Sequence, residues 1–130
     1  MIAPVRVVVA DDDDMLRDLI ALNLESEGVE VHEARDGAEA LRRIVETRPD
    51  LVVLDVMMPI HDGLAVLRRL KAEPCTADIP VVLLTARAAP HDIDQGWEAG
   101  ADFYLTKPFR VEQLLDLVRE ISLRPPLGAA

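Results

Sequence analysis

The stretch PDLVVLDVMMPIHDG, residues 49–63, decides how the whole chain is interpreted. Its apolar run, Leu51 to Leu54, ends abruptly at a carboxylate, Asp55. A short apolar run bounded by turn-forming residues predicts a strand that is buried on both faces of a sheet. An acid at the end of such a strand is costly unless it is solvated, paired or bound to a metal. The stretch therefore predicts a reactive carboxylate at the rim of a parallel sheet.

Strand-like and helix-like segments alternate along the sequence. Apolar runs rich in β-branched residues predict strands, and the alternating pattern of the second one is typical of a sheet edge. The expected strands lie at residues 5–10, 29–34, 51–55, 79–84 and 103–105. Apolar residues at helical spacing predict a helix after each strand. In the first helix, the residues expected to face inward are Leu16, Leu19, Ile20 and Leu24. This strict alternation predicts an α/β fold, a doubly wound five-stranded parallel sheet with five helices on its two faces.

The composition predicts a single soluble, cytoplasmic domain. The chain has 130 residues and half of them are hydrophobic, which suffices for a core and is too apolar for disorder. No apolar run approaches the length of a membrane span, so we expect no membrane association. We expect the domain to occupy residues 1–123, and the RPPLGAA segment at 124–130 to be a tail or the start of a linker.

The charge and the cysteine content exclude several classes of protein. The net charge of −10 argues against direct nucleic-acid binding by this domain, which would require a basic face. Aromatic residues are few, so the chain lacks a stacking platform for bases or for a flavin. Cys75 is the only cysteine, which excludes an intrachain disulfide, and we interpret it as an inert loop thiol.

Polar side chains interrupt the apolar pattern where four of the expected strands end. These residues are Asp11 and Asp12 after the first strand, Asp55 at the third, Thr85 and Ala86 at the fourth, and Lys107 after the fifth. In a doubly wound sheet the functional crevice lies at the carboxyl ends of the strands. We therefore expect these groups to converge on one rim. Asp13 and Asp14 are interpreted instead as favourable charges at the start of the first helix.

The expected rim has the chemistry of phosphoryl transfer. Three carboxylates brought together repel one another and need a cation, and a hard divalent ion such as Mg²⁺ accepts their oxygens. Lys107, the Thr85 hydroxyl and the Ala86 backbone N–H are suited to a phosphoryl group, whose charge is spread over its oxygens. A carboxylate can accept that group as an aspartyl-phosphate. The residues thus predict Mg²⁺-dependent transfer of a phosphoryl group onto an aspartate.

From about residue 5 to residue 121 the sequence resembles the receiver domain of response regulators in bacterial two-component signal transduction. The motifs that carry the resemblance are the acid pair Asp11-Asp12 after VRVVVA, the segment LDVMMPIHDG, the pair Thr85-Ala86, and GADFYLTKPF. Together and in order they form a specific signature. The resemblance implies a flavodoxin-like sheet with the strand order 2-1-3-4-5.

The resemblance also implies a role for each residue of the rim. Asp55 would be the phosphoacceptor, loaded from the phosphohistidine of a sensor histidine kinase or of a phosphotransfer protein in a phosphorelay. Asp12 would hold Mg²⁺ directly, Asp11 mostly through water, and the backbone carbonyl of Met57 would complete the protein ligands. The groups implied to contact the phosphoryl oxygens are Thr85, the Ala86 N–H and Lys107.

The resemblance further implies a signalling switch, not a turnover enzyme. Thr85 would move towards the phosphoryl group and Tyr104 would turn inward, changing the surface formed by the fourth helix, fifth strand and fifth helix. That surface could also support a homodimer. A cis peptide bond is implied between Lys107 and Pro108, since X–Pro is the bond where cis is cheap. The domain would catalyse only its own phosphorylation and dephosphorylation, and any output domain would lie outside this chain.

Three other functions are weighed on particular residues. A phosphatase or mutase working through an aspartyl-phosphate would need a second acid near the nucleophile, and the residue two positions after Asp55 is Met57. A flavodoxin-like cofactor binder would not place four aspartates, residues 11–14, where phosphate must bind. A degenerate receiver would lack part of the site. We also predict that Met57 and Arg87 hinder the attacking water and lengthen the phosphorylated lifetime.

Overall fold

The computed structural model describes residues 5–58, 60, 62–86 and 90–122, and within them five strands alternate with five helices. The strands are β1 (Arg6–Ala10), β2 (Glu30–Ala34), β3 (Leu51–Asp55), β4 (Val81–Thr85) and β5 (Phe103–Thr106). The helices are α1 (Asp14–Glu25), α2 (Gly37–Thr47), α3 (Gly63–Ala72), α4 (Pro90–Glu98) and α5 (Val111–Ser122). The predicted alternation is confirmed. The segment 124–130 and Arg87 lie outside the described residues, so the predictions made for them stay predictions.

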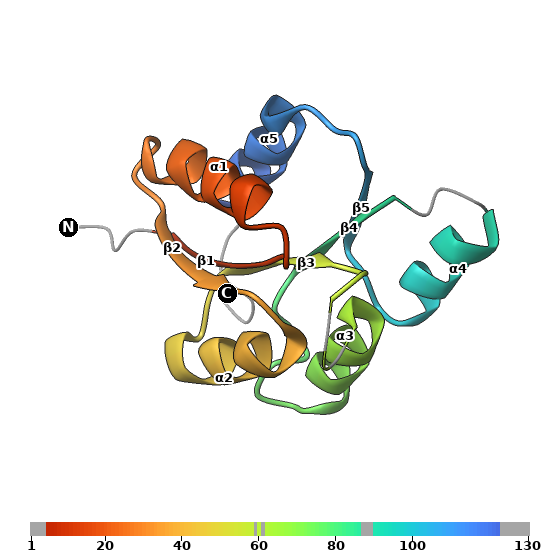
Figure 1. Ribbon diagram of the computed structural model, residues 1–130. Coiled ribbons are helices and arrows are strands. Elements are labelled where there is room, and N and C mark those ends of the chain that lie inside the picture. The colour runs from red at the N-terminus through yellow and green to blue at the C-terminus, as the bar shows by residue number, and fades with distance from the viewer. Residues whose placement is uncertain (1–4, 59, 61, 87–89, 123–130) are drawn as a thin grey trace.

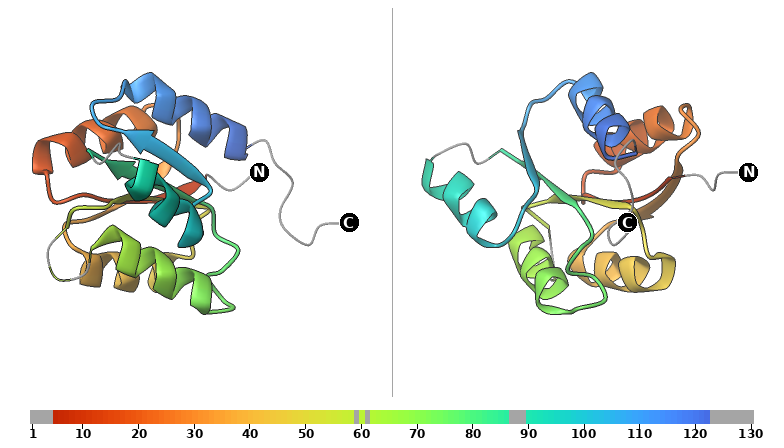
Figure 2. Two further views of the ribbon diagram at one scale, coloured as in Figure 1. Left: turned by 90° about the vertical axis from the view of Figure 1, so that its right-hand side faces the viewer. Right: turned by 180° about the vertical axis from the view of Figure 1, so that it is seen from behind.

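The strands form one parallel sheet in the order β2-β1-β3-β4-β5, as the resemblance predicts. Helices α1 and α5 cover one face and α2 and α3 cover the other, while α4 lies beside β5 (Figures 1 and 2). The register pairs Ala10 with Leu54, and Asp55 with Leu84. The carboxyl ends of β1, β3 and β4 therefore meet at one edge of the sheet.

Two apolar clusters, one on each face of the sheet, form the core. In β1 the side chains of Val7 and Val9 enter one cluster, whereas those of Val8 and Ala10 enter the other, and all four are fully buried. This alternation follows from the two-residue period of a strand. Complete burial of a valine side chain contributes roughly 1.5–3 kcal/mol to stability. Strands β3 and β4 are apolar and buried up to the polar residues at their carboxyl ends, Asp55 and Thr85.

Aspartates begin three of the helices. Asp13, Asp36 and Asp62 have extended backbone, and each side chain accepts hydrogen bonds from backbone N–H groups in the first turn of α1, α2 and α3, respectively. Such caps satisfy donors that have no partner within the helix. Gly28 and Gly100 follow α1 and α4 with φ of +85° and +104°, a conformation that favours glycine. These signals explain why the helices begin and end where the sequence predicts.

The inward face of α1 differs from the prediction. Leu19 was expected to point inward, but it is 46 % exposed. Arg17 is buried instead, on the same face as Ile20 and Leu24. The hydrophobic pattern places Arg17 in solvent because a buried guanidinium is costly without partners. The structure supplies three partners, and they lie at the rim of the sheet.

Among the described residues, no helix is both long and apolar enough to span a membrane.

Candidate functional site

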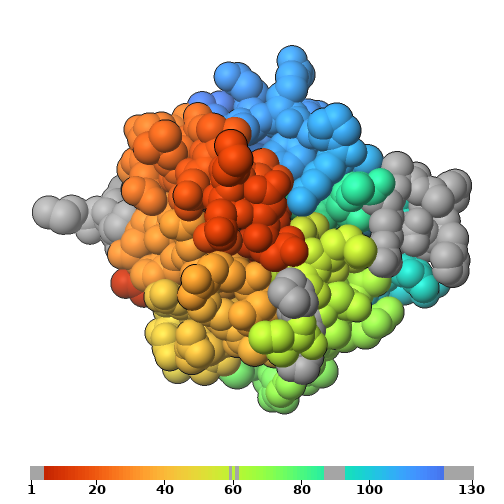
Figure 3. Space-filling view, viewed as in Figure 1, coloured from red at the N-terminus to blue at the C-terminus, as the bar shows by residue number. Residues whose placement is uncertain are grey.

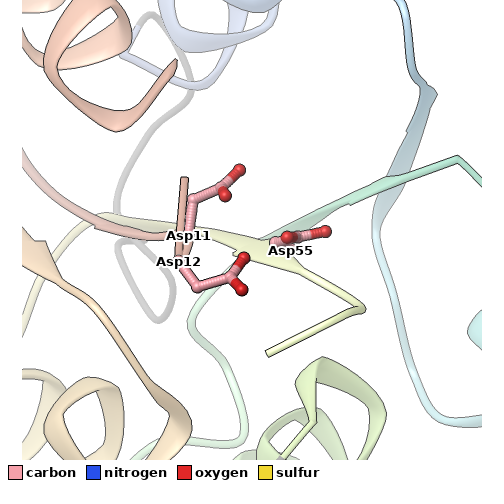
Figure 4. A group of neighbouring side chains, drawn as sticks. All are labelled: Asp11, Asp12 and Asp55. Atoms are coloured by element: carbon pink, nitrogen blue, oxygen red, sulfur yellow. The ribbon is translucent and has the colours of Figure 1, made fainter. Parts of the chain in front are cut away.

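The predicted acidic residues meet at the carboxyl ends of β1 and β3. Each of Asp11, Asp12 and Asp55 has a carboxylate oxygen within 4.8 Å of those of the other two. Asp11 and Asp12 lie on the segment leaving β1, and Asp55 ends the neighbouring strand (Figure 4). Asp11 and Asp55 are buried, with exposures of 0 % and 3 %, whereas Asp12 is exposed. On the molecular surface, the start of α1 adjoins the residues that follow β3 (Figure 3).

Lys107 connects this acidic cluster to β5. Its Nζ donates a hydrogen bond of 3.1 Å to Asp11 Oδ2 and lies 3.4 Å from Asp55 Oδ2. The Lys107 backbone N–H donates to the carbonyl of Thr85 at 2.6 Å, which ties the segment after β5 to the end of β4. The peptide bond between Lys107 and Pro108 is cis, the isomer that the resemblance predicts. One ammonium group thus faces two buried carboxylates.

The charge balance shifts the protonation of Asp55. Burial raises the pKa of the Asp55 carboxyl, and the neighbouring Asp11 charge raises it further. Lys107 and a hydrogen bond from the Met57 N–H lower it, and the resulting pKa is about 6. Burial alone would lower the pKa of Lys107, but the charges of Asp55 and Asp11 outweigh it and raise that pKa above its ordinary value. Lys107 therefore stays charged, while Asp55 lies in an under-compensated negative environment.

Thr85 and Ala86 bring the fourth strand to the same rim. Thr85 ends β4 and is fully buried, next to Leu84, which pairs with Asp55 in the sheet. Ala86 is exposed. A cavity of about 440 Å³ opens beside it, lined by Asp13, Leu16, Ala86, Lys107, Pro108 and Phe109. Two of the predicted phosphoryl-binding residues, Ala86 and Lys107, therefore border this cavity, and Lys107 also lies next to Asp55.

The segment after β3 is held close to the acceptor. The backbone N–H of Met57 donates to Asp55 Oδ1 at 3.3 Å, and the Met57 side chain is 53 % exposed. The Gly63 N–H donates to the Val56 carbonyl at 3.0 Å. A Cβ on Gly63 would lie 2.3 Å from the Asp55 carbonyl oxygen, so only glycine fits. No local pattern in the sequence indicates this close approach.

Tyr104 lies away from the acidic cluster, against α4. Its ring is half-buried and packs against the tryptophan ring of Trp97, with centroids 6.1 Å apart and planes tilted by 44°. A Cβ on Gly96 would lie 2.8 Å from the Tyr104 ring, so the absence of a side chain there makes room for the tyrosine. The predicted switch residue thus contacts the helix whose surface it is expected to change.

Sequence reasoning missed Arg17 as a residue of this region. Its Nη1 donates to the Asp11 carbonyl at 2.8 Å, Nη2 donates to Asp14 Oδ1 at 2.6 Å, and Nε donates to Glu33 Oε1 at 3.1 Å. The sequence did contain one indication of its burial. Arg17 lies three residues before Ile20 and seven before Leu24, and this spacing places it on the same buried face of the helix.

The residues of the rim fit a hard divalent cation. Two buried carboxylates and one exposed carboxylate provide oxygen ligands, and a single ammonium group only partly offsets their charge. An exposed carboxylate suits Mg²⁺, which usually keeps several water ligands. Within the described residues, this is the only group of three or more acidic, histidine or cysteine side chains with suitable spacing.

A doubly wound parallel sheet with an acidic cluster and a lysine at its carboxyl edge is the arrangement typical of receiver domains. The sequence matches the response regulator receiver domain family over residues 7–119, and the chain belongs to that family. Receiver domains of this family take phosphoryl groups from histidine kinases and bind Mg²⁺ in an acidic pocket, and they act in signalling, not in metabolism. The family predicted from the sequence motifs is therefore confirmed.

Similar proteins are full regulators as well as isolated receiver domains. The chain is 45 % identical over 119 residues to the DNA-binding dual master transcriptional regulator RpaA of Synechocystis, covering 92 % of this chain and 49 % of that protein. It is 46 % identical over 121 residues to the response regulator MprA of a Mycobacterium species, covering 93 % and 52 %. A putative response regulator structure from Chloroflexus aurantiacus aligns with a TM-score of 0.87 at 36 % identity, covering 94 % and 100 %. The chain spans about half the length of the curated relatives it matches.

Proposed function

We propose that this protein is a phosphorylation-activated signalling switch in which Asp55 accepts a phosphoryl group. The observation that carries the proposal is the setting of Asp55. It is a buried carboxylate 3.4 Å from Lys107 Nζ and clustered with Asp11 and Asp12. Two further carboxylates beside a buried acid destabilise its charged form, so a purely structural role does not explain why they cluster there. The proposed donors are the phosphohistidine of a sensor histidine kinase or of a phosphotransfer protein, in the cytoplasm.

In the proposed reaction, a carboxylate oxygen of Asp55 attacks the phosphorus atom of the phosphohistidine. The P–N bond breaks and its electron pair stays on the imidazole nitrogen, which leaves an acyl phosphate on Asp55. Lys107, already within 3.4 Å of Asp55, pairs with the phosphoryl oxygens as charge develops on them. Thr85 and the Ala86 N–H, at the end of the adjacent strand, provide further donors.

The proposed Mg²⁺ ligands are the three aspartates and the backbone carbonyl of Met57. Asp12 would bind the ion directly, Asp11 mostly through water, and Asp55 through its carboxylate. When bound, Mg²⁺ supplies positive charge that offsets the carboxylates and the transferred phosphoryl oxygens. The exposure of Asp12 and the burial of Asp11 agree with these different modes, because an exposed carboxylate can replace water on an ion that enters from solvent.

The proposed switch links Thr85 to the surface formed by α4, β5 and α5. Thr85 would move towards the phosphoryl group, and Tyr104 would leave its contact with Trp97 and turn inward. The altered surface would regulate partner binding, including a homodimer through α4, β5 and α5. The phosphoryl group needs to bias only two states that differ by a few kcal/mol. An output domain of the kind present in the DNA-binding relative would respond outside residues 1–123.

Acetyl phosphate tests the proposal. We expect the protein incubated with Mg²⁺ and acetyl phosphate to gain the mass of one phosphoryl group, and we expect no gain in Asp55→Asn or with EDTA. No adduct under any condition would favour a degenerate receiver that binds partners unmodified. Continuous phosphate release from many phosphomonoesters would favour a turnover enzyme. Faster loss of the adduct in Met57→Asn and in Arg87→Ala would support the predicted protection of the acyl phosphate from water.

A further inference from the structure

The buried guanidinium of Arg17 holds the backbone beside the acidic cluster. Its Nη1 donates 2.8 Å to the carbonyl of Asp11, a bond buried from solvent. Its other nitrogens bind Asp14, in the first turn of α1, and Glu33, in β2. The side chain is only 9 % exposed. One planar group therefore connects the chain leaving β1 to a neighbouring strand and to the helix that follows.

This contact fixes a peptide unit, not a carboxylate. The Asp11 N–H donates to the Ala34 carbonyl at 3.1 Å, so both backbone polar groups of Asp11 have a partner. The carbonyl of Asp11 and the N–H of Asp12 belong to the same planar peptide group. Holding that carbonyl sets the orientation of the plane, and hence the direction in which the Asp12 side chain leaves the backbone.

Asp11 and Asp12 depend on this anchor to different degrees. The Asp11 carboxylate has two contacts of its own, from the Asp13 N–H at 2.9 Å and from Lys107 Nζ at 3.1 Å. The part of the chain that the structure describes gives the Asp12 carboxylate no hydrogen bond or ion pair. Among the described contacts, only the backbone to which it is attached holds the Asp12 side chain in place.

We propose that Arg17 is a positioning residue of the metal site, which orients Asp12 towards the cation by fixing the peptide unit between Asp11 and Asp12. The inference rests on the proposed function, since it assigns the cation to the acidic cluster. Arg17 does not touch the cation or the phosphoryl group in this role. Groups that orient metal ligands in this way typically change metal affinity 10- to 100-fold when they are removed.

Charge and geometry predict opposite results for Arg17, which makes the proposal testable. Removing a positive charge near the cluster should by itself strengthen cation binding. Loss of the anchor should weaken it, because Asp12 then samples orientations that do not bind. Burial lowers the pKa of Arg17, but Asp14 and Glu33 more than offset this and raise it, so the wild-type side chain is charged and Arg17→Met removes that charge.

The experiment is a calorimetric titration of the folded protein with MgCl₂. We expect Arg17→Met to bind Mg²⁺ roughly ten-fold more weakly than the wild type. Arg17→Lys keeps the charge but cannot direct three hydrogen bonds in the same plane, so we expect its affinity to fall as well. The matched control is Arg119→Met, which removes an exposed arginine of α5 that pairs with Asp116 on the same helix and with Glu27 in the turn after α1. Its Mg²⁺ affinity should equal that of the wild type.

Urea unfolding in EDTA shows whether each variant is folded during the titration, and Arg17→Lys decides the proposal if Arg17→Met does not fold. Unchanged or tighter Mg²⁺ binding in a folded Arg17 variant would overturn the proposal, as would a wild type that does not bind Mg²⁺. Acetyl phosphate treatment of the wild type tests the proposed function separately. If the wild type binds Mg²⁺ but forms no adduct, the phosphoacceptor function fails, while the dissociation constants still decide the role of Arg17.

Discussion

Two lysines lie at opposite ends of the same sheet, and their surroundings differ in charge. At the amino end, Lys71 Nζ donates to two backbone carbonyls and lies 3.3 Å from one carboxylate, that of Asp102. At the carboxyl end, Lys107 Nζ lies 3.1 Å from Asp11 and 3.4 Å from Asp55, and both carboxylates are buried. The first lysine has one negative partner and the second has two.

This difference separates a charge-balanced ion pair from one that keeps an excess of negative charge. All three N–H donors of Lys71 have an acceptor, and the charge of Asp102 balances its own. The carboxyl end keeps an excess of negative charge, and the pKa of Asp55 is raised to about 6. A site with unbalanced charge is stabilised by a cation or by a change in protonation, whereas a balanced pair needs neither. The same residue types therefore balance each other's charge at one end of the sheet, whereas at the other end they leave the environment in which we propose that Asp55 reacts.

The largest expected effect is on Lys107. Removing one donor aimed at developing charge typically slows a reaction by 10²–10³-fold. We therefore expect Lys107→Met to react with acetyl phosphate about 100-fold more slowly than the wild type at saturating Mg²⁺. The rate of adduct formation, followed by intact mass, is the measurement. An unchanged rate would mean that Lys107 only compensates the charge of the aspartates.

Lys71→Met should give the converse result. It leaves the carbonyls of Ala77 and Ile79 without this donor and Asp102 without its cation, so we expect a loss of about 2 kcal/mol in unfolding free energy. The rate of phosphorylation should match that of the wild type. Urea unfolding and the acetyl phosphate assay provide the two measurements. A large fall in rate would show that the two ends of the sheet are coupled.

Asp55→Asn should stabilise the Mg²⁺-free protein at neutral pH. Burial and Asp11 raise the pKa of Asp55 from 3.8 to about 6, so the folded state binds the proton more tightly than the unfolded state. That contribution to stability is present below pH 3.8 and is lost as the pH rises through 6. Removing the ionised group should therefore add roughly 1–3 kcal/mol at pH 7. The gain should fade as the pH falls towards 4.

Urea unfolding in EDTA between pH 4 and 7.5 measures this effect, with Asp102→Asn as a matched control. Asp102 is more exposed than Asp55, and an asparagine can still accept the hydrogen bond from the Val81 N–H. We expect this control to lose about 0.5 kcal/mol, the smallest of the four effects. If the unfolding free energies of the two variants depend on pH in the same way, the raised pKa of Asp55 is not the cause of the effect.

The fold followed from the sequence because its strongest signals are local. Residues 51–54 are apolar without interruption, and full burial of β3 between two helical layers is what such a run predicts. The polar residues at strand ends identified the rim, since parallel strands end at a common edge. The meeting of Asp11, Asp55 and Lys107 at this rim could thus be predicted from the sequence alone.

Other features of the site depend on packing that no local pattern contains. The neighbouring aspartates Asp11 and Asp12 are identical in type, and only the path of the chain after β1 makes the first buried and the second exposed. Hydrophobic periodicity assigns Arg17 to solvent, because the three acceptors that make its burial tolerable come from three separate segments. The approach of Gly63 to the Asp55 carbonyl becomes visible only when α3 is placed against β3.

The contact between Trp97 and Tyr104 gives the protein an intrinsic optical probe. Trp97 is the only tryptophan in the chain, and its ring lies 6.1 Å from the ring of Tyr104. Indole emission is sensitive to its immediate surroundings, so a tyrosine that leaves this contact should change the emission without any attached label. Stopped-flow fluorescence after mixing with acetyl phosphate and Mg²⁺ could then time the rearrangement on α4, separately from the chemistry at Asp55.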